Sequence, residues 1–336
     1  MQLAWSQALR KAMRRRDFIK AIAGSILPTG QPAARAQDAD RIYRIAVLSL
    51  EPRTAANYVA FFDELRKLGF EEDRNLVVDG RGFDARSDQF PDLAATAVMS
   101  HVDALVCGGT TGIRAAQRAT QTIPIVGVTD DMVGSGLVRS LAKPGGNTTG
   151  ISILATELDG KRLEILIELV PEARRMAALA DPGATGPKQL QTLVEAGRAH
   201  DVQLLVYRIT KREEIIGAIN EAKTSGAAAL NVLATPLFNR HRQLIIERAA
   251  ILGLPAIYQW PETAKEGGLA AYGPSFAQVG RQNAHQLASV LRGTRPSDLP
   301  VQQPTKFELA INLTTAKALG ITVASSLLAR ADEVIE

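Results

Sequence analysis

Short apolar segments of strand length alternate with segments of helical periodicity along most of the chain, and this alternation limits the possible folds. In the first half, four segments predict buried strands: residues 41–50, 75–79, 103–107 and 123–128. Between and after them, three segments predict helices: residues 57–68, 90–99 and 113–120. Such alternation is typical of a parallel sheet with helices on both faces.

The pattern stops at the Pro- and Gly-rich residues 144–150 and then restarts. Helices are predicted at residues 158–170, 190–200, 212–225 and 240–252. Strands are predicted at residues 175–180, 202–208, 227–233 and 256–258. A chain of 336 residues has room for two such units. We therefore predict an α/β fold of two Rossmann-like lobes with parallel sheets. Ligands of such sheets bind at the carboxyl ends of the strands, so a cleft between the lobes is expected.

The predicted boundaries follow from this restart. Lobe 1 spans residues 41–152 and is joined by part of about 273–300, and lobe 2 spans residues 153–272. The sequence leaves open whether residues 301–336 belong to the second lobe.

Residues 1–36 have the three parts of an export signal. Residues 14–20 read RRRDFIK, which resembles the twin-arginine pattern, and a short, mildly apolar stretch follows at 21–27. Residues 34–36 read Ala-Arg-Ala, the form of a signal-peptidase site. The apolar stretch is shorter than the ~20 residues that a membrane span needs. We expect a cleaved signal peptide and a periplasmic protein.

The excess of basic residues belongs to this segment. The chain has 39 Lys and Arg against 35 Asp and Glu, a net charge of +4. Residues 1–36 hold seven of the basic residues and one acidic residue, which leaves the rest at −2. The charge therefore gives no indication of a nucleic-acid partner.

Several common chemistries lack their residues. Cys107 is the single cysteine, which excludes an internal disulfide and a multi-cysteine zinc site. Neither the dinucleotide-binding glycine pattern nor the P-loop pattern is present, and the four histidines lack metal-ligand spacing. We expect no cofactor, no metal and no catalytic residue.

The candidate ligand residues of the first lobe follow two predicted strands. In the turn at residues 108–112, Gly109 lets the backbone approach a ligand, and Thr110 and Thr111 offer hydroxyls at a helix N-terminus that suits a carboxylate. An ordinary turn with threonine as the helix cap is the alternative. Asp130 and Asp131 follow the next strand and could accept from a ligand amine, or cap a short helix instead. The turn also has the form G-x-T-x-G, which resembles the G-x-S-x-G turn that holds the nucleophile of some hydrolases. The sequence offers no convincing base to accompany it.

In the second lobe, polar and aromatic residues lie at or near the ends of predicted strands. Asn231 and Thr235 lie at and after one strand, while Tyr258, Trp260 and Tyr272 lie near the ends of later ones. Aromatic rings line small-molecule pockets and stack on flat ligands. Simple core packing is the alternative for each ring.

Several segments together resemble one family of proteins. They are residues 13–19, 143–150 (KPGGNTTG), 161–164 (KRLE), 255–258 (PAIY), 267–269 (GGL), 299–308 (LPVQQPTKFE), and the ending at 312–313 and 331–335. The chain resembles the substrate-binding proteins of ABC transporters that include the bacterial tryptophan/tyrosine-type binding components, over essentially the whole length after the signal.

The resemblance implies a type I-like periplasmic binding protein that delivers its ligand to an ABC permease in the inner membrane. By analogy its cleft includes Ser49, the turn at 109–111, Asp131, Thr235 and Tyr258. Many relatives have Gly-Asp-Pro or Thr-Asp-Pro after the fourth strand, where this chain has Thr-Asp-Asp-Met at residues 129–132. This difference assigns the position of the family's acid to Asp130.

We therefore expect an extracytoplasmic solute-binding protein of an ABC importer. Its first-choice ligand is an aromatic amino acid or aromatic carboxylate, from the aromatic cluster and the helix N-terminus. A monomer without nucleic-acid partners is expected. Two alternatives stay open: a periplasmic ligand sensor for a membrane receptor, and, less favoured, an exported α/β hydrolase.

Overall fold

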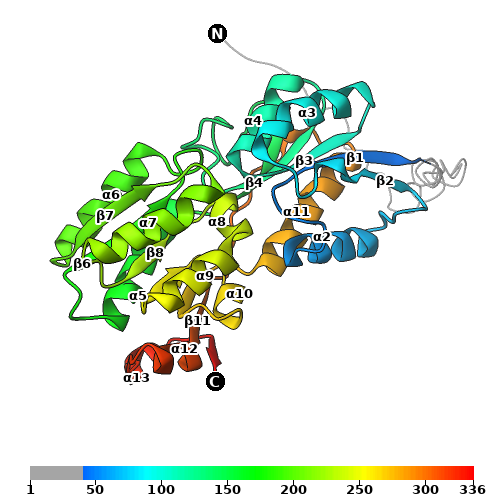
Figure 1. Cartoon of the computed structure of the whole chain (residues 1–336). Coiled ribbons are helices and arrows are strands. Elements are labelled where there is room, and N and C mark those ends of the chain that lie inside the picture. Colours follow the sequence, from blue (N-terminus) through cyan, green and yellow to red (C-terminus); the bar gives the residue numbers. More distant parts are fainter. Residues whose placement is uncertain (1–40) are drawn as a thin grey trace, which may run out of the picture. The chain divides into compact units, whose positions relative to one another are not determined.

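The structure, a computed structural model, describes residues 41–336 of the chain. The predicted signal peptide at residues 1–36, with its twin-arginine pattern, lies outside the described residues. Figure 1 shows two β-sheets in the described part, each with helices packed against it.

The first sheet has five parallel strands in the order β2-β1-β3-β4-β5. Its strands are β1 (Tyr43–Leu48), β2 (Leu76–Asp79), β3 (Ala104–Gly108), β4 (Ile125–Thr129) and β5 (Thr148–Ser152). The first four overlap the apolar segments that predicted them and extend past the carboxyl ends of these segments by at most one residue. Their side chains alternate between the two faces of the sheet, so both faces need a covering layer.

The fifth strand was not predicted, because the sequence indicated a break there. β5 reads Thr-Thr-Gly-Ile-Ser, which is too polar for a typical buried strand, yet all five residues are buried. The Thr149 hydroxyl donates to the Leu299 carbonyl at 2.7 Å, which satisfies this buried group. A Cβ at Gly150 would collide with the Gly127 backbone of β4, so the close pairing requires glycine there.

Helices cover both faces of the five-stranded sheet. They are α2 (Ala56–Lys67), α3 (Phe90–Met99), α4 (Gly109–Ala119) and α11 (Phe276–Leu291), with the 3₁₀ turns η1 (Gly80–Gly82) and η2 (Ser87–Gln89). α3 and α4 pack with one set of alternate strand side chains, such as Leu105. α2 and α11 pack with the other set, such as Val106. α11 comes from far along the chain but lies alongside α2 (Figure 1).

The second sheet has seven strands in the order β12-β11-β10-β9-β8-β6-β7. They are β6 (Arg175–Ala180), β7 (Gln203–Arg208), β8 (Leu230–Val232), β9 (Ala256–Tyr258), β10 (Ala270–Gly273), β11 (Glu308–Asn312) and β12 (Glu333–Ile335). Only the β10–β11 pair is antiparallel among these described strands.

This sheet is also covered on both faces. Its helices are α5 (Ala155–Leu169), α6 (Pro187–Ala199), α7 (Arg212–Thr224), α8 (Pro236–Arg240), α9 (Arg242–Ile251), α10 (Glu262–Lys265), α12 (Leu313–Ala318) and α13 (Ser325–Leu328). α5, α6, α12 and α13 share a core with Ala178 of β6, whereas α7 to α10 share one with Ala177, its neighbour on the other face. The helix predicted at 240–252 corresponds to α9, and the short helix α8, which ends just before it at Arg240, was not predicted.

The two sheets repeat one topology. The orders β2-β1-β3-β4-β5 and β7-β6-β8-β9-β10 are the same flavodoxin-like order. In this order the second strand lies on one side of the first, and the third and later strands lie on the other side. The fold is therefore α/β with two Rossmann-like lobes. Ligands of such sheets bind at the carboxyl ends of the strands, near the boundary between these two sides.

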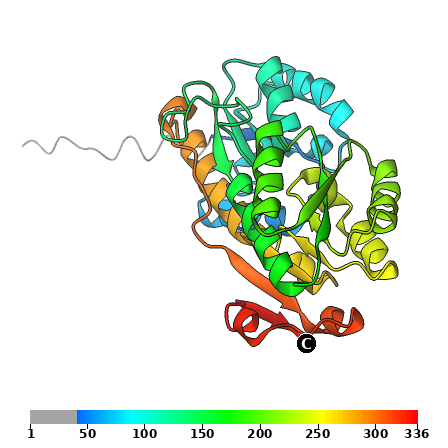
Figure 2. The same ribbon diagram turned by 90° about the vertical axis from the view of Figure 1, so that its left-hand side faces the viewer.

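Three segments of the described chain pass between the lobes. The first joins β5 to α5, and the second joins β10 to α11, which packs on the five-stranded sheet. The third follows η3 (Pro296–Asp298) and runs to β11, with Gln302 bridging to Ile151 of β5 on the way. Figure 2 shows this last segment as the orange stretch that leads down to β11 and the C-terminal elements. Within residues 41–336, no helix is long and apolar enough to span a bilayer.

Candidate functional site

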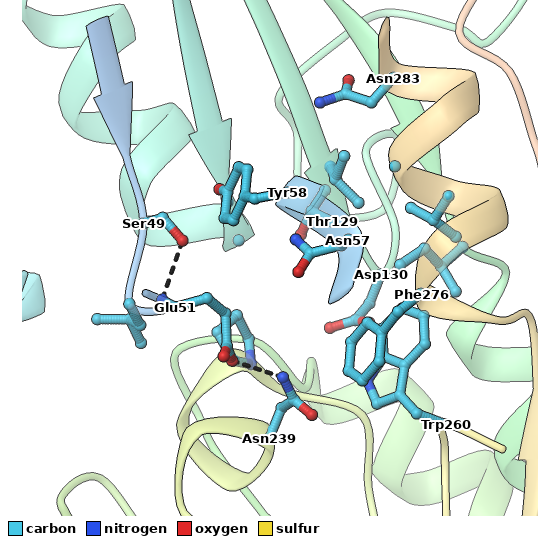
Figure 3. Close-up of a pocket in the computed structure, with 18 of the residues that line it drawn as sticks. Ser49, Glu51, Asn57, Tyr58, Thr129, Asp130, Asn239, Trp260, Phe276 and Asn283 are labelled. Atoms are coloured by element: carbon cyan, nitrogen blue, oxygen red, sulfur yellow. Dashed lines mark hydrogen bonds between the residues drawn. The ribbon is translucent and has the colours of Figure 1, made fainter. Parts of the chain in front are cut away.

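A cavity lies between the two lobes, at the carboxyl ends of strands from both sheets (Figure 3). Its walls come from the segments after β1, β3, β4 and β5 of the first lobe, after β8 and β9 of the second, and from α2 and α11. The space not filled by protein, including the part open to solvent, is about 760 Å³.

One wall contains the start of α4. Gly108 and Gly109 line the cavity, and no side chain caps the helix at Gly108. The first N–H groups of a helix have no partner within the helix and carry the positive end of its dipole. This wall can therefore bind an anionic group through the backbone. Beside it, the Ser49 hydroxyl accepts from the Glu51 backbone N–H at 2.9 Å.

Asp130 follows β4 and extends into the cavity (Figure 3). Its side chain is 7 % exposed. The pKa of Asp130 is raised to about 8, mainly by burial and also by the nearby carboxylate of Asp159, while the charge of Arg162 opposes the rise. Asp130 is therefore a buried acid that gains stabilisation from any cation placed beside it.

The neighbours of Asp130 in the second lobe form a buried ion pair on α5. Arg162 pairs with Asp159, and both side chains are almost completely buried. Arg162 also donates to the Tyr272 carbonyl at 3.1 Å, and Gln189 donates to Asp159 at 2.5 Å. Burial raises the pKa of Asp159, while Arg162 opposes this rise.

Two aromatic rings from different elements form an apolar wall. Trp260, just after β9, stacks on Phe276 at the start of α11, with ring centroids 4.0 Å apart and an interplanar angle of 17°. Figure 3 shows the stacked pair close to Asp130. A flat ligand can pack on such a surface while its cationic group faces the carboxylate.

The rim contains contacts that cross between the lobes. Asn239 of α8 donates to the Glu51 carboxylate at 2.5 Å, and Arg240 donates to the Leu50 carbonyl. Arg240 also pairs with Asp84 at 2.7 Å. Burial raises the pKa of Glu51, and the hydrogen bond from Asn239 opposes this rise. These contacts hold α8 against the first lobe.

Five of the residues predicted from the sequence line the cavity: Ser49, Gly109, Asp130, Thr235 and Trp260. The Thr235 side chain also caps α8 by accepting from the Phe238 N–H at 3.1 Å. All five follow strands at their carboxyl ends, where the rule for parallel sheets places ligand contacts.

Two of the predicted residues in the first lobe do not line it because their side chains have other roles. Thr110 shares a 2.8 Å hydrogen bond with Thr129, and both are buried. Asp131 accepts from the backbone N–H groups of residues 133 and 134, which closes a turn, and the described segment between β4 and β5 contains no helix for it to cap. Thr111 is exposed on α4, outside the cavity.

The other predicted residues of the second lobe also lie outside the cavity. Asn231 is fully buried within β8. Tyr258 packs in the core beneath α7 to α10, and Tyr272 packs near Phe307 with ring centroids 6.4 Å apart. For these two rings the structure shows core packing.

Sequence reasoning missed the contribution of two helices. Asn57 and Tyr58 on α2, and Phe276 and Asn283 on α11, all line the cavity. Glycine at position 280 lets α11 approach the Asn57 backbone, where a Cβ would collide. A polar residue on the apolar face of α11 was the available signal. Part of about 273–300 was expected to join the first lobe, but no helix was predicted there.

The lining has two acids, Glu51 and Asp130, and no lysine, arginine or histidine among the described residues. Cys107 reaches the cavity wall, but burial raises the pKa of its thiol, which disfavours a thiolate. No group of three or more His, Cys, Asp or Glu side chains within residues 41–336 could hold a metal ion. The arrangement suits binding of a small molecule with a cationic group and an aromatic part.

Comparisons with known proteins identify the family. The family model described as "ABC transporter substrate binding protein" matches residues 44–335. A tyrosine-binding protein of Clostridioides difficile is 28% identical over 269 residues, which cover 77% of this chain and 75% of that protein.

Solved structures share the fold. A conserved domain protein from Vibrio cholerae matches with a TM-score of 0.81 and 26% identity, over 88% of this chain and 99% of that one. An ABC domain in complex with L-Trp from Streptococcus pneumoniae matches with a TM-score of 0.79 and 22% identity, over 88% and 100%. A ligand-free, open substrate-binding protein from Clostridium difficile matches with a TM-score of 0.62 and 24% identity, over 88% and 99%. Since the family model spans nearly all of the described residues, the chain belongs to the substrate-binding proteins of ABC transporters.

Proposed function

We propose that this protein binds an aromatic α-amino acid in the cavity between its lobes and delivers it to the permease of an ABC importer. The observation that carries the proposal is the placement of Asp130 beside the stacked rings of Trp260 and Phe276. The ligand's ammonium group pairs with the Asp130 carboxylate, and its ring packs on Trp260.

The third recognition element is the uncapped start of α4. The ligand's carboxylate accepts from the backbone N–H groups at Gly109 and the residues after it, where the helix dipole favours a negative charge. The three elements together match the three parts of an aromatic amino acid. The names of two relatives, a tyrosine-binding protein and an L-Trp complex, support this choice of ligand.

Closure of the lobes couples binding to delivery. The contacts of Asn239 and Arg240 with the first lobe are available only while α8 lies against it, so they belong to a closed state. A ligand that touches both lobes stabilises that state.

Proteins of this family act outside the cytoplasm. We extend this to a cleaved signal peptide at residues 1–36, a periplasmic location and a monomeric state. Mass spectrometry of the protein secreted by its host would give the N-terminus after residue 36, and light scattering would give the mass of one chain.

Calorimetry with L-tyrosine, L-tryptophan and L-phenylalanine tests the ligand, with indole-3-propionate as the analogue that lacks the amine. We expect micromolar or tighter binding of at least one amino acid and at least tenfold weaker binding of the analogue. The ligand at 100 times its Kd should raise the free energy of unfolding by about 2.7 kcal/mol. No binding of any aromatic amino acid at millimolar concentration would refute the proposal.

Neighbouring acids provide a matched pair of variants. Asp130→Asn removes the carboxylate in the cavity and should weaken binding at least tenfold. Asp131→Asn changes the adjacent acid, which caps its own loop through Oδ1, an atom that asparagine retains. Equal loss of affinity in both variants would contradict the placement of the ammonium group at Asp130.

A sensor would use the same cavity, so binding alone does not separate the two roles. Uptake of the radiolabelled amino acid by cells with and without the gene does so. Loss of uptake supports delivery to a permease, whereas unchanged uptake with a lost transcriptional response supports the sensor.

A further inference from the structure

Three asparagines that line the cavity carry a buried oxygen atom without a hydrogen-bond partner in the described part of the chain. The amide of Asn239 is already bound to Glu51 at the rim, whereas the other two lie on helices of the first-lobe wall. Asn57 lies on α2 and Asn283 on α11, and both line the cavity. The Oδ1 atom of each is buried and has no hydrogen-bond partner within the described chain. The Asn283 side chain is 4 % exposed, and Figure 3 shows its amide extending from α11 into the cavity.

The surrounding protein does not provide a donor for these oxygens. On α11 the lining residues near Asn283 are Phe276, Val279 and Gly280, which have no polar side-chain atoms. The Tyr58 hydroxyl is already hydrogen-bonded to Ser49. A buried acceptor without a donor is costly, and native proteins retain few of them without a reason.

The two helices hold the amides in place. α2 and α11 pack against each other along their lengths, and Gly280 lies directly against the Asn57 backbone. This packing fixes the backbone positions from which both side chains reach the cavity. The amides are therefore placed to donate to and accept from whatever occupies it.

The Asn283 amide lies at a different part of the cavity from Asp130. Asp130 follows β4 and neighbours the Trp260–Phe276 stack, whereas Asn283 lies further along α11, with Asn57 and Thr129 between them in the view of Figure 3. A ligand whose ammonium group meets Asp130 therefore presents another group toward Asn283, past Asn57. That group must donate a hydrogen bond to satisfy either oxygen.

We propose that Asn57 and Asn283 are specificity-determining residues that accept a hydrogen bond from an O–H or N–H group on the ligand's ring. The inference rests on the proposed function, because it takes the ligand to be an aromatic amino acid. It predicts selection of a phenol or an indole over a plain phenyl ring. Sites that hydrogen-bond a ligand hydroxyl reject the analogue without it more strongly than apolar pockets reject a missing methylene.

The wild-type protein and four ligands test the selection without any mutation. Calorimetry should give L-tyrosine or L-tryptophan a Kd at least tenfold below those of L-phenylalanine and 4-fluoro-L-phenylalanine. The fluorinated ring fills space at the para position but has no donor, so it separates hydrogen bonding from size.

Variants on α11 then test whether the amides cause the preference for ligands with a ring donor. Asn283→Leu keeps a similar volume without polar atoms and should reduce the preference for the donor ligand to within about threefold. Gln282→Leu is the matched control, because Gln282 is the neighbouring amide on α11, also has an unpaired buried oxygen, and does not line the cavity. It should retain the wild-type preference.

The outcomes separate the two proposals. Binding of all four ligands with equal affinity overturns the role of the amides and leaves the aromatic amino acid assignment standing. Binding of none of them overturns both. If Asn283→Leu fails to fold, as circular dichroism would show, Asn57→Leu and the ligand series on the wild-type protein still decide the matter.

Discussion

The two lobes share one strand order but use the ends of their strands differently. After β1 of the first lobe, Ser49 and Glu51 line the cavity. After β6, the equivalent strand of the second lobe, the Asp181 carboxylate accepts from the Gly183 N–H at 2.8 Å and does not line it. The shared topology therefore places equivalent loops at the same edge of each sheet, but only some of these loops line the cavity.

Buried charge marks the same difference. The second lobe keeps Arg162 and Asp159 as a pair inside α5 and its surroundings, with the hydrogen bonds that such a pair needs. In the first lobe, Asp130 is buried at the cavity without a paired cation among the described residues that line it. The second lobe thus satisfies its buried charge internally, whereas the first leaves a buried carboxyl group that ionises beside a ligand's cation.

The largest expected effect comes from breaking the internal pair. Arg162→Met leaves Asp159 buried without its cation and should lower the free energy of unfolding by about 3–5 kcal/mol. Lys161→Met is the control one residue away, because the Lys161–Glu164 pair, 2.8 Å apart, is largely exposed. Its loss should be below about 1 kcal/mol. Urea unfolding measures both, and similar losses would contradict the contrast.

The carboxyl group left for the ligand predicts the next largest effect, which depends on pH. The pKa of Asp130 is about 8 in the folded chain and about 3.8 in the unfolded chain. Between these values the folded state binds a proton that the unfolded state has released, so stability falls as pH rises. The slope is about 1.4 kcal/mol per pH unit from pH 5 to 7.

Asp130→Asn isolates this contribution from other titrating groups. The wild-type protein should lose stability relative to the variant between pH 5 and pH 7 in urea unfolding without ligand. A constant difference over this range would show that Asp130 is ionised in the free protein. Binding of an ammonium group should also release a proton at pH 7, which calorimetry in buffers of different ionisation enthalpy detects.

Two strands of the first lobe, β3 and β5, show which parts of the fold the sequence predicts. Apolar runs such as the one in β3 indicate strands directly, because both faces of a parallel sheet are buried. β5 escaped prediction because its burial depends on hydroxyls such as that of Thr149, whose partner Leu299 lies 150 positions away. A pattern read from neighbouring residues gives no information about a partner so far along the chain.

The sequence predicts the site residues to a similar extent and fails for a similar reason. Loops after strands are predictable, since topology alone brings the ends of parallel strands together, and this rule found Asp130 and Trp260. It does not say which residue of a loop faces inward, so Asp131 was included although it caps its own loop. Asn283 was missed because no helix was predicted within about 273–300, although part of this segment was expected to join the first lobe, so the face of α11 that lines the cavity was not identified.

A smaller effect is expected where the lobes meet at the rim. Arg240→Ala removes the ion pair with Asp84 and the hydrogen bond to Leu50, both of which cross between the lobes. The closed state loses population, so the affinity for the amino acid should fall about three- to tenfold. Arg81→Ala is the control, because Arg81 pairs with Asp79 within the first lobe. Unchanged affinity in Arg240→Ala would show that these contacts do not contribute to closure.

The smallest effect should come from Thr110, which supports the first-lobe wall without lining the cavity. Thr110→Val removes the buried 2.8 Å hydrogen bond to Thr129 and should cost about 1 kcal/mol of stability, with affinity changed by less than about threefold. Thr111→Val, at the exposed neighbour, should change neither quantity measurably. A loss of affinity beyond tenfold in Thr110→Val alone would mean that its hydroxyl turns from Thr129 to the bound ligand. In that case the first lobe would recognise the carboxylate with a side chain as well as with the backbone of α4, and the two lobes would differ less than their buried charges indicate.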